Sequence, residues 1–347
     1  MDRYIGIDAH SESCTVAVMG PSGKRLKEAR LETNGQVLTD FIRTIAGHRY
    51  ICFEEGTQAE WLYELLEPIA KEVVVQLSAA SHGRKNDSID AWKCADLLRR
   101  GDIQRPVYKA PDKFTALRAA ARAYEVTQRD MVRTKVRLNA LYRSRALSGM
   151  GAEIYDPERR DSWLAKLAPP RCQYAQLLSE QLDGLVEAHQ RAECWLREEA
   201  KKVPLVRLLE SAPGIGQIRA AQLVAVVLSP HRFRSRRQFW SYSALGITTR
   251  SSSDWTKDRN GKWVRREVAQ TRGLNRNRNP TLKRVFIGAA DSVIQCMPNH
   301  PLNRAYQRTI EAGTKPNLAR LTVARRLAGA VLAMWKHREV YDPAKQQ

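Results

Sequence analysis

The sequence predicts an α/β region that is followed by two mostly helical regions. In residues 1–105, short apolar runs alternate with segments whose apolar residues have helical spacing, and this alternation is typical of an α/β layer. Pro106 and Pro111 indicate a linker, after which the spacing stays helical over long stretches. The basic side chains gather at the end, where residues 206–347 hold 26 Lys and Arg against 8 Asp and Glu. The predicted domains are therefore 1–105, 106–205 and 206–347.

In the first region, the pattern predicts five strands and three helices. Apolar runs bounded by turn residues predict strands over 4–8, 14–19, 25–31, 50–54 and 73–77. Apolar residues at helical spacing predict helices over 35–45, 61–66 and 88–99. Strands that alternate with helices in this order support an α/β layer.

The second region is expected to form a long helical hairpin. Helical spacing runs over residues 114–147 and again over 174–202, and the Pro169-Pro170 pair is expected to interrupt it. Two long antiparallel helices of this kind, a coiled coil, are amphipathic enough to dimerise. A plain two-helix spacer is the alternative.

Charge and composition narrow the class of protein. The 347 residues carry a net charge of +21, which favours a polyanionic partner such as nucleic acid. No apolar run approaches the ~20 residues that a membrane span needs, and the first ten residues lack the apolar stretch of a signal peptide. Six widely spaced cysteines without a CxxC pair, and histidines that form no cluster, argue against a zinc module or a disulfide scaffold. We therefore expect a soluble, cytoplasmic protein with no membrane partner.

Four acidic residues of the first region form a candidate metal site. Asp8 and Glu54 each end a predicted strand, and the i, i+3 spacing of Asp87 and Asp90 puts both on one face near a helix start. Carboxylates held together repel one another unless cations neutralise them, and Mg²⁺ prefers oxygen ligands. Two such ions ~4 Å apart can clamp the attacking and leaving oxygens of a phosphodiester. Taken singly, each acid is alternatively a surface charge, and Asp87 alternatively caps the helix that follows.

The segments around these acids carry a family resemblance. The strings YIGIDAH, ICFEEGT and KNDSIDA resemble the amino-terminal half of the IS-one-ten family of insertion-sequence transposases. The resemblance implies a RuvC-like domain of RNase H type, in which four acids in the order Asp, Glu, Asp, Asp (DEDD) bind Mg²⁺ or Mn²⁺. Asp8, Glu54, Asp87 and Asp90 match these catalytic, metal-binding positions. Glu55 is the alternative to Glu54, which is preferred because an apolar strand directly precedes it.

The third region opens with a glycine turn. Gly214 and Gly216 lie in a Pro-Gly-x-Gly segment between two expected helices. The backbone N–H groups that such a turn exposes can hold a nucleic-acid phosphate at the terminus of the following helix, in the manner of a helix-hairpin-helix turn. The alternative is a tight turn that only needs the dihedral angles of glycine.

A run of three serines beside Arg250 is the candidate nucleophile segment, although its composition alone is typical of a polar loop. The family has a leucine-glycine segment, then a serine nucleophile, then a basic stretch. Matching Leu245 to the family's leucine places the nucleophile at Ser252, with Ser251 and Ser253 as alternatives. Attack of the serine on a phosphodiester implies a phosphoserine link that stores the bond for rejoining without ATP.

Residues 254–278 are longer and more basic than the corresponding family segment, so we expect an extra arm there. The cations of the arm and of its flanks are expected to contact nucleic-acid phosphates. They are Arg250, Lys257, Arg259, Lys262, Arg265, Arg266, Arg272, Arg276, Arg278, Lys283 and Arg284. The aromatic residues that interleave with them either stack on bases or pack the core. The partner of the arm, DNA or RNA, stays open.

The resemblance implies a transposase or site-specific recombinase that cuts and rejoins donor and target DNA. It also implies that a bridge RNA guides the enzyme. A homo-oligomer, dimer or tetramer, would bring the acids of one subunit to the serine of another. Two alternatives need fewer parts: a metal-dependent junction resolvase or nuclease that uses only the acids, and a non-catalytic nucleic-acid-binding scaffold.

Overall fold

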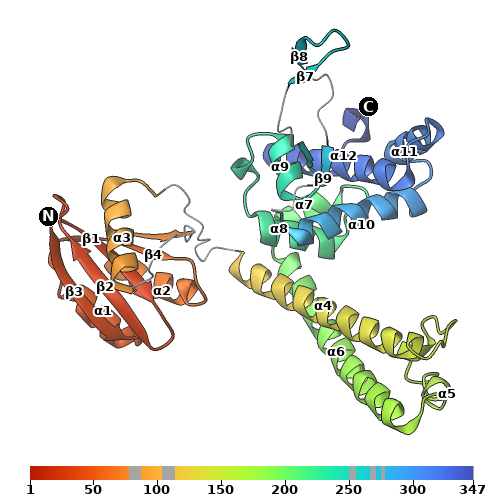
Figure 1. Cartoon of the computed structure of the whole chain (residues 1–347), viewed down its shortest axis with the longest axis horizontal. Helices are drawn as coiled ribbons and strands as arrows, with labels where there is room; N and C mark the ends of the chain where they lie inside the picture. The colour runs from red at the N-terminus through yellow and green to blue at the C-terminus, as the bar shows by residue number, and fades with distance from the viewer. Residues whose placement is uncertain (78–86, 104–113, 250–254, 266–270, 275–277, 347) are drawn as a thin grey trace. The chain divides into compact units, whose positions relative to one another are not determined.

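The structure is a computed structural model that describes residues 1–77, 87–103, 114–249, 255–265, 271–274 and 278–346. The chain divides into two compact units, Met1–Asp112 and Lys113–Gln347, which Figure 1 shows in the colour order of the chain. The first unit is α/β and the second is mostly helical, as predicted. Within the described residues, no helix combines the length and the apolar character that a bilayer span requires.

The first unit contains one mixed sheet of five strands in the order β3-β2-β1-β4-β5. The strands are β1 (Asp2–Ala9), β2 (Ser13–Met19), β3 (Arg25–Glu32), β4 (His48–Glu54) and β5 (Glu72–Gln76). β1, β2 and β3 pair in antiparallel fashion, whereas β1, β4 and β5 run parallel. All five predicted strands are confirmed, with bounds that differ by one or two residues.

Three helices cover the sheet: α1 (Gly35–Arg43), α2 (Ala59–Leu66) and α3 (Asp87–Arg100). The Asn34 side chain starts α1 by accepting hydrogen bonds from the backbone N–H groups of Gln36 and Val37. One face of the sheet buries its apolar side chains against α1 and α2, and these form a core: Ile5, Ile7, Val16, Ile51 and Phe53 with Leu38, Ile42, Leu62 and Leu66. Ala91, Trp92 and Ala95 of α3 pack with Ala17 and Met19 of the sheet in a second, smaller cluster.

The second unit begins with the predicted helical hairpin, α4 (Thr115–Arg143) and α6 (Pro169–Lys201), with the short helices η2 (Glu153–Tyr155) and α5 (Asp161–Leu164) at its tip. The expectation that Pro169 and Pro170 interrupt the helix is wrong, because they form its first turn. Proline is tolerated there since a first-turn N–H has no partner within the helix. At its other end the hairpin shares a core with the helices that follow, through Leu117 and Leu196.

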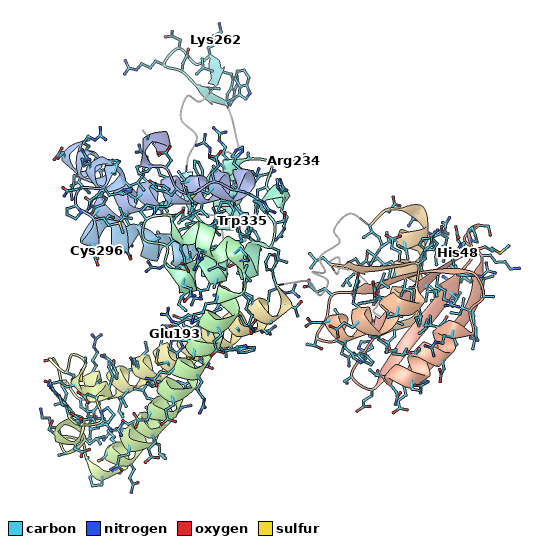
Figure 2. The ribbon with its side chains drawn as sticks, turned by 180° about the vertical axis from the view of Figure 1, so that it is seen from behind. His48, Glu193, Arg234, Lys262, Cys296 and Trp335 are labelled. Atoms are coloured by element: carbon cyan, nitrogen blue, oxygen red, sulfur yellow. The ribbon has the colours of Figure 1, made fainter. Side chains whose placement is uncertain are left out.

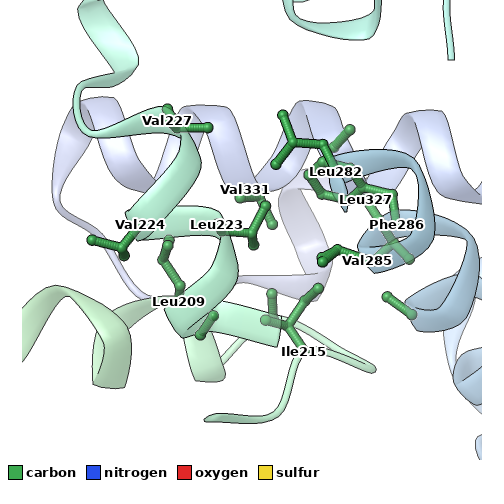
Figure 3. Close-up of a cluster of buried hydrophobic side chains, with 14 of the residues drawn as sticks. Leu209, Ile215, Leu223, Val224, Val227, Leu282, Val285, Phe286, Leu327 and Val331 are labelled. Carbon is green, nitrogen blue, oxygen red and sulfur yellow. The ribbon is translucent and has the colours of Figure 1, made fainter. Parts of the chain in front are cut away.

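The rest of the second unit is a helical domain built around one long, buried helix. Its helices are α7 (Pro204–Glu210), α8 (Gln217–Val227), α9 (Arg236–Tyr242), α10 (Pro280–Cys296), α11 (Pro301–Glu311) and α12 (Pro316–His337), with the short turns η3 (Pro230–Arg232) and η4 (Pro343–Gln346). Leu327 and Val331 of α12 lie in the cluster with Leu223 of α8 and Phe286 of α10 (Figure 3). This apolar packing fixes α8 against α10, and the glycine turn lies at the start of α8.

Two small antiparallel pairs lie between α9 and α10. β6 (Ile247–Thr249) pairs with β9 (Thr271–Leu274), and β7 (Trp255–Lys257) pairs with β8 (Trp263–Arg265). The basic stretch that was expected to form an arm therefore contains a β-ribbon, β7–β8.

Candidate functional site

Two neighbouring parallel strands bring Asp8 and Glu54 to the same end of the sheet. β1 and β4 pair with Ile7 opposite Phe53, so Asp8 and Glu54 follow at the next step along each strand. Side chains alternate between the faces of a strand. Because Ile7 and Phe53 are buried in the α1–α2 core, Asp8 and Glu54 belong to the opposite face of the sheet.

Gly6 lets α3 approach this opposite face closely. A Cβ atom at position 6 would lie 1.9 Å from the carbonyl oxygen of Ala91 and 2.6 Å from the amide nitrogen of Ala95. No other residue type allows the two backbones to come this near. Asp87 and Asp90 occupy the first turn of α3. The close packing of α3 on β1 therefore brings two acids of the helix towards the acid of the strand.

His10 joins Asp8 and Asp87 in one group. Its Nε2 lies 3.3 Å from Oδ2 of Asp8 and 3.4 Å from Oδ1 of Asp87. One ligand atom from each of the three residues lies within 4.8 Å of the other two. His10 was not among the predicted site residues, because the histidines form no cluster in the sequence. The two-residue spacing Asp8-Ala9-His10 at a strand end was the available signal, since such residues share a face.

Negative charge accumulates around Asp8. Its pKa is raised above the ordinary value, first by burial, and also by the negative charges of Asp87 and Asp90; His10 acts in the opposite direction. Asp90 therefore lies close enough to influence Asp8. Oxygen ligands that repel one another when ionised suit a hard divalent cation, so these residues fit the Mg²⁺ that the sequence predicts.

Glu54 and Glu55 differ in their surroundings. Glu54 is half-buried at the end of β4, whereas Glu55 is exposed and its backbone N–H donates to the carbonyl of Gln76 at 2.8 Å. Two residues before Glu54 on β4, a hydrogen bond to the Cys94 thiol and burial raise the pKa of Cys52. The Cys52 thiol is thus protonated and contributes no charge to the site.

The glycine turn joins α7 to α8, and its two glycines have different environments. Gly214 has a φ of +71°, and a Cβ atom there would lie 2.4 Å from the carbonyl oxygen of Ala289 in α10. Nη1 of Arg219 donates to the carbonyl of Gly214 at 2.6 Å and to Oγ of Ser292 at 2.9 Å. Gly216 is the N-cap of α8, and a Cβ atom there would meet nothing within 4 Å. Packing and dihedral angle therefore both require glycine at 214, and neither requires it at 216.

The structure describes the approach to the serine run but not the run itself. Leu245 is buried, and its carbonyl accepts a hydrogen bond from Nε of Arg325 at 2.7 Å. β6 then begins at Ile247. Six predicted site residues lie outside the described residues: Arg250, Ser251, Ser252, Ser253, Arg266 and Arg276. The predicted linker with Pro106 and Pro111 also lies outside them.

The remaining predicted cations lie on the β7–β8 ribbon, on β9, and at or just before the start of α10. Lys257, Arg259 and Lys262 are exposed on the β7–β8 ribbon, where Figure 2 labels Lys262. Arg265 and Arg272 belong to β8 and β9. Arg278 is exposed just before α10, and Lys283 and Arg284 lie in its first turns. Arg284 is ion-paired with Glu125 of α4.

Two family models match the chain, one in each part that carries predicted chemistry. A DEDD transposase model of IS110 type, described as "Transposase", matches residues 5–144 and so spans all four acids. A model described as "Transposase IS116/IS110/IS902 family" matches residues 206–307, from within α7 into α11, and so includes the glycine turn. The chain belongs to the IS110 (IS-one-ten) family of transposases. Members of this IS110 family are DNA-binding enzymes that cut and rejoin DNA. Comparison with curated proteins finds no match.

Proposed function

We propose that this IS110 transposase is a recombinase that uses metal ions and a serine nucleophile. The observation that carries the proposal is the meeting of Asp8, Asp87 and His10 at one end of the sheet, in a chain whose two halves both match transposase models. The acids come from segments almost 80 residues apart in sequence. Burial and mutual repulsion raise the pKa of Asp8, which supports cation binding rather than a purely structural role.

The first unit is proposed to be a RuvC-like domain of RNase H type. The sheet order β3-β2-β1-β4-β5, with antiparallel pairing on one side of β1 and parallel pairing on the other, supports this assignment. So does the position of the first acid at the end of the central strand. The proposed domains remain 1–105 for this part, 106–205 for a dimerising hairpin and 206–347 for the basic transposase part.

Asp8, Glu54, Asp87 and Asp90 are the proposed ligands of Mg²⁺, or of Mn²⁺ in its place. When bound, such an ion would polarise the scissile phosphate and stabilise the departing oxygen. Asp8 and Asp87 would approach the metal from strand and helix, and Asp90 and Glu54 would complete the set. His10 is placed to hold Asp8 and Asp87 in position by contact with both carboxylates.

Ser252 is the proposed nucleophile. Its hydroxyl oxygen would lose its proton and form a bond to the phosphorus while the bond from phosphorus to one deoxyribose oxygen breaks. That oxygen would take up a proton and leave as a hydroxyl, and the DNA would stay joined to the protein. Attack by another strand's deoxyribose hydroxyl would reverse the step and rejoin DNA without ATP. The chain that leads to this residue is held by the hydrogen bond between Leu245 and Arg325.

The basic second unit is proposed to hold the nucleic acids. The open backbone at Gly216 and the exposed Lys257, Arg259, Lys262 and Arg278 support phosphate contacts there. A bridge RNA that pairs with donor and target DNA, and an oligomer in which acids and serine come from different subunits, complete the proposal. The test for the RNA is whether it copurifies, and whether changing its loop changes the DNA site used.

The experiment that tests the reaction traps the full chain on a nicked suicide DNA in Mg²⁺ and maps the modified residue by mass spectrometry. We expect a phosphoserine adduct at residue 252, lost in Ser252→Ala and kept in the matched Ser251→Ala and Ser253→Ala variants. If Ser252→Ala still cuts DNA, a hydrolytic nuclease is the better assignment. If Asp8→Asn leaves both DNA binding and recombination intact, the scaffold alternative holds.

A further inference from the structure

The β7–β8 ribbon carries two tryptophans and a lysine on one face. Lys257 pairs directly opposite Trp263, and Trp255 lies two residues before Lys257 on the same strand. Residues directly opposite each other on paired strands share a face, and so do residues two apart on one strand. Trp255, Lys257 and Trp263 therefore share one face of the ribbon, and Val264 belongs to the other face.

These tryptophans are not part of a core. The exposed fractions of Trp255 and Trp263 are 55% and 61%, in strands of only three residues each. By contrast, Trp335 is buried, and Trp240 is half-buried with its Nε1 donating to the carbonyl of Arg325 at 3.0 Å. Two indole rings that are each more than half exposed on one small ribbon present a large apolar surface to solvent. Of the two roles that the sequence allowed the aromatic residues, core packing is excluded for this pair.

The charges around the two rings are positive. Nζ of Lys257 lies 5.4 Å from the centre of the Trp263 ring, so the cation lies over the indole face. Arg259 and Lys262 are exposed in the connecting turn. The acid of this turn, Asp258, is engaged in the turn itself, because its carboxylate accepts from the backbone N–H groups of Asn260 and Lys262, each at 2.9 Å.

We propose that this face binds unpaired nucleotides, with bases stacked on Trp255 and Trp263 and phosphates held by Lys257, Arg259 and Lys262. Indole faces can stack on any base, and such stacking tolerates any sequence. Paired bases inside a duplex are already stacked and offer only their edges in the grooves, so flat rings favour a strand that is open. The proposal deepens the nucleic-acid role of the second unit and does not depend on the serine chemistry. DNA opened for strand exchange and a single-stranded RNA loop share the required chemistry.

The test compares the binding of the full-length protein to three labelled probes by fluorescence anisotropy at one fixed salt concentration: a single-stranded DNA, the RNA of the same sequence, and the blunt DNA duplex. We expect Trp263→Ala and Trp255→Ala each to weaken single-strand binding by between about 5-fold and 150-fold. Binding to the duplex is expected to change less than 2-fold. The RNA and DNA arms show which strand the ribbon prefers.

Three controls separate stacking from a loss of structure. Trp263→Phe keeps an aromatic face and should restore most of the binding. Val264→Thr alters the opposite face of the ribbon, and Trp195→Ala removes a tryptophan of α6 that is 40% exposed; neither should affect single-strand binding. Lys257→Ala should lower the salt dependence of single-strand binding by about 0.7 in slope, whereas the tryptophan variants should leave that slope unchanged.

Equal losses on single strands and duplex, no loss on either single strand, or no rescue by Trp263→Phe would each overturn the proposal. Ser252→Ala protein serves as the independent reference. If it binds single strands as tightly as the natural chain but fails to cut, binding by the ribbon is independent of the serine chemistry and both proposals stand. If it cuts normally while the tryptophan variants show the expected loss, only the proposed nucleophile is wrong.

Discussion

Gly6 of β1 and Ala91 of α3 are in backbone contact, since even a single methyl group at position 6 would lie 1.9 Å from the Ala91 carbonyl oxygen. This contact sets the distance between the sheet and the helix that carries Asp87 and Asp90. The candidate metal site therefore depends on a residue that has no side chain and is not one of the predicted ligands.

Gly6→Ala is expected to destabilise the first unit by about 3 kcal/mol, because the added carbon must push α3 away from the sheet. Urea unfolding followed by circular dichroism measures the change. The matched control is Gly56→Ala, because a Cβ atom there would meet nothing within 4 Å. If the two variants are equally stable, the close packing of α3 on β1 is contradicted.

Asp8→Asn should have opposite effects with and without metal. In EDTA, we expect the variant to melt at a higher temperature than the natural chain, because it removes a charge that burial and two nearby carboxylates destabilise. In 10 mM Mg²⁺ the order should reverse, because the natural chain gains stability from the bound ion and the variant loses a ligand. Asp40→Asn, which changes an exposed acid of α1, is the control and should shift neither melting temperature. An unchanged order in the two buffers would argue against a metal at this site.

The raised pKa of Asp8 also predicts a pH dependence. Below the ordinary value of 3.8, Asp8 is protonated in both folded and unfolded chains. As the pH rises through the higher pKa of the folded state, the folded chain releases a proton at a cost, so metal-free natural protein loses stability relative to Asp8→Asn. Metal affinity should change in the opposite sense and fall on acidification, because protons compete for the carboxylate. Melting curves from pH 4 to pH 7, with and without Mg²⁺, measure both trends.

The two glycines of the turn before α8 should respond differently to alanine. Gly214→Ala is expected to cost about 2–4 kcal/mol, because its φ of +71° disfavours a side chain and the added carbon would meet the Ala289 backbone. Gly216→Ala should change the unfolding free energy by less than about 1 kcal/mol, since its φ is −84° and the space around it is open. Denaturant unfolding distinguishes them, and similar costs at both positions would be inconsistent with the described turn.

Glu125 connects the hairpin to the helical domain. Its carboxylate accepts from the hydroxyl of Thr281 at 2.5 Å and from the guanidinium of Arg284. Glu125→Gln should lower the unfolding free energy of the second unit by about 1–2 kcal/mol, because it weakens charge-assisted hydrogen bonds. Glu187→Gln on α6 is the exposed control and should have no measurable effect. If Glu125→Gln changes the unfolding free energy as little as Glu187→Gln does, the contacts of Glu125 do not hold the hairpin to the helical domain.

The period of the apolar residues was enough to locate the elements of the first unit, because a half-buried strand or helix must place apolar side chains at a fixed spacing whatever its neighbours are. The positions of Asp8 and Glu54 at strand ends followed from the same pattern. The start of α6 was misplaced, because a proline pair ends one helix or begins another with the same local chemistry.

By itself, then, the sequence determined the order of strands and helices, the basic character of the second unit, and the acids and glycines from which the site is built. Only the tertiary structure decided that His10 joins Asp8 and Asp87, that Gly214 is required by its contact with Ala289, and that Trp255 and Trp263 are exposed together. The first two depend on distances between segments that are far apart along the chain, and the third depends on what the rest of the fold leaves uncovered. Tertiary packing sets these distances and determines which side chains stay exposed, and the local spacing of residues along the sequence encodes neither.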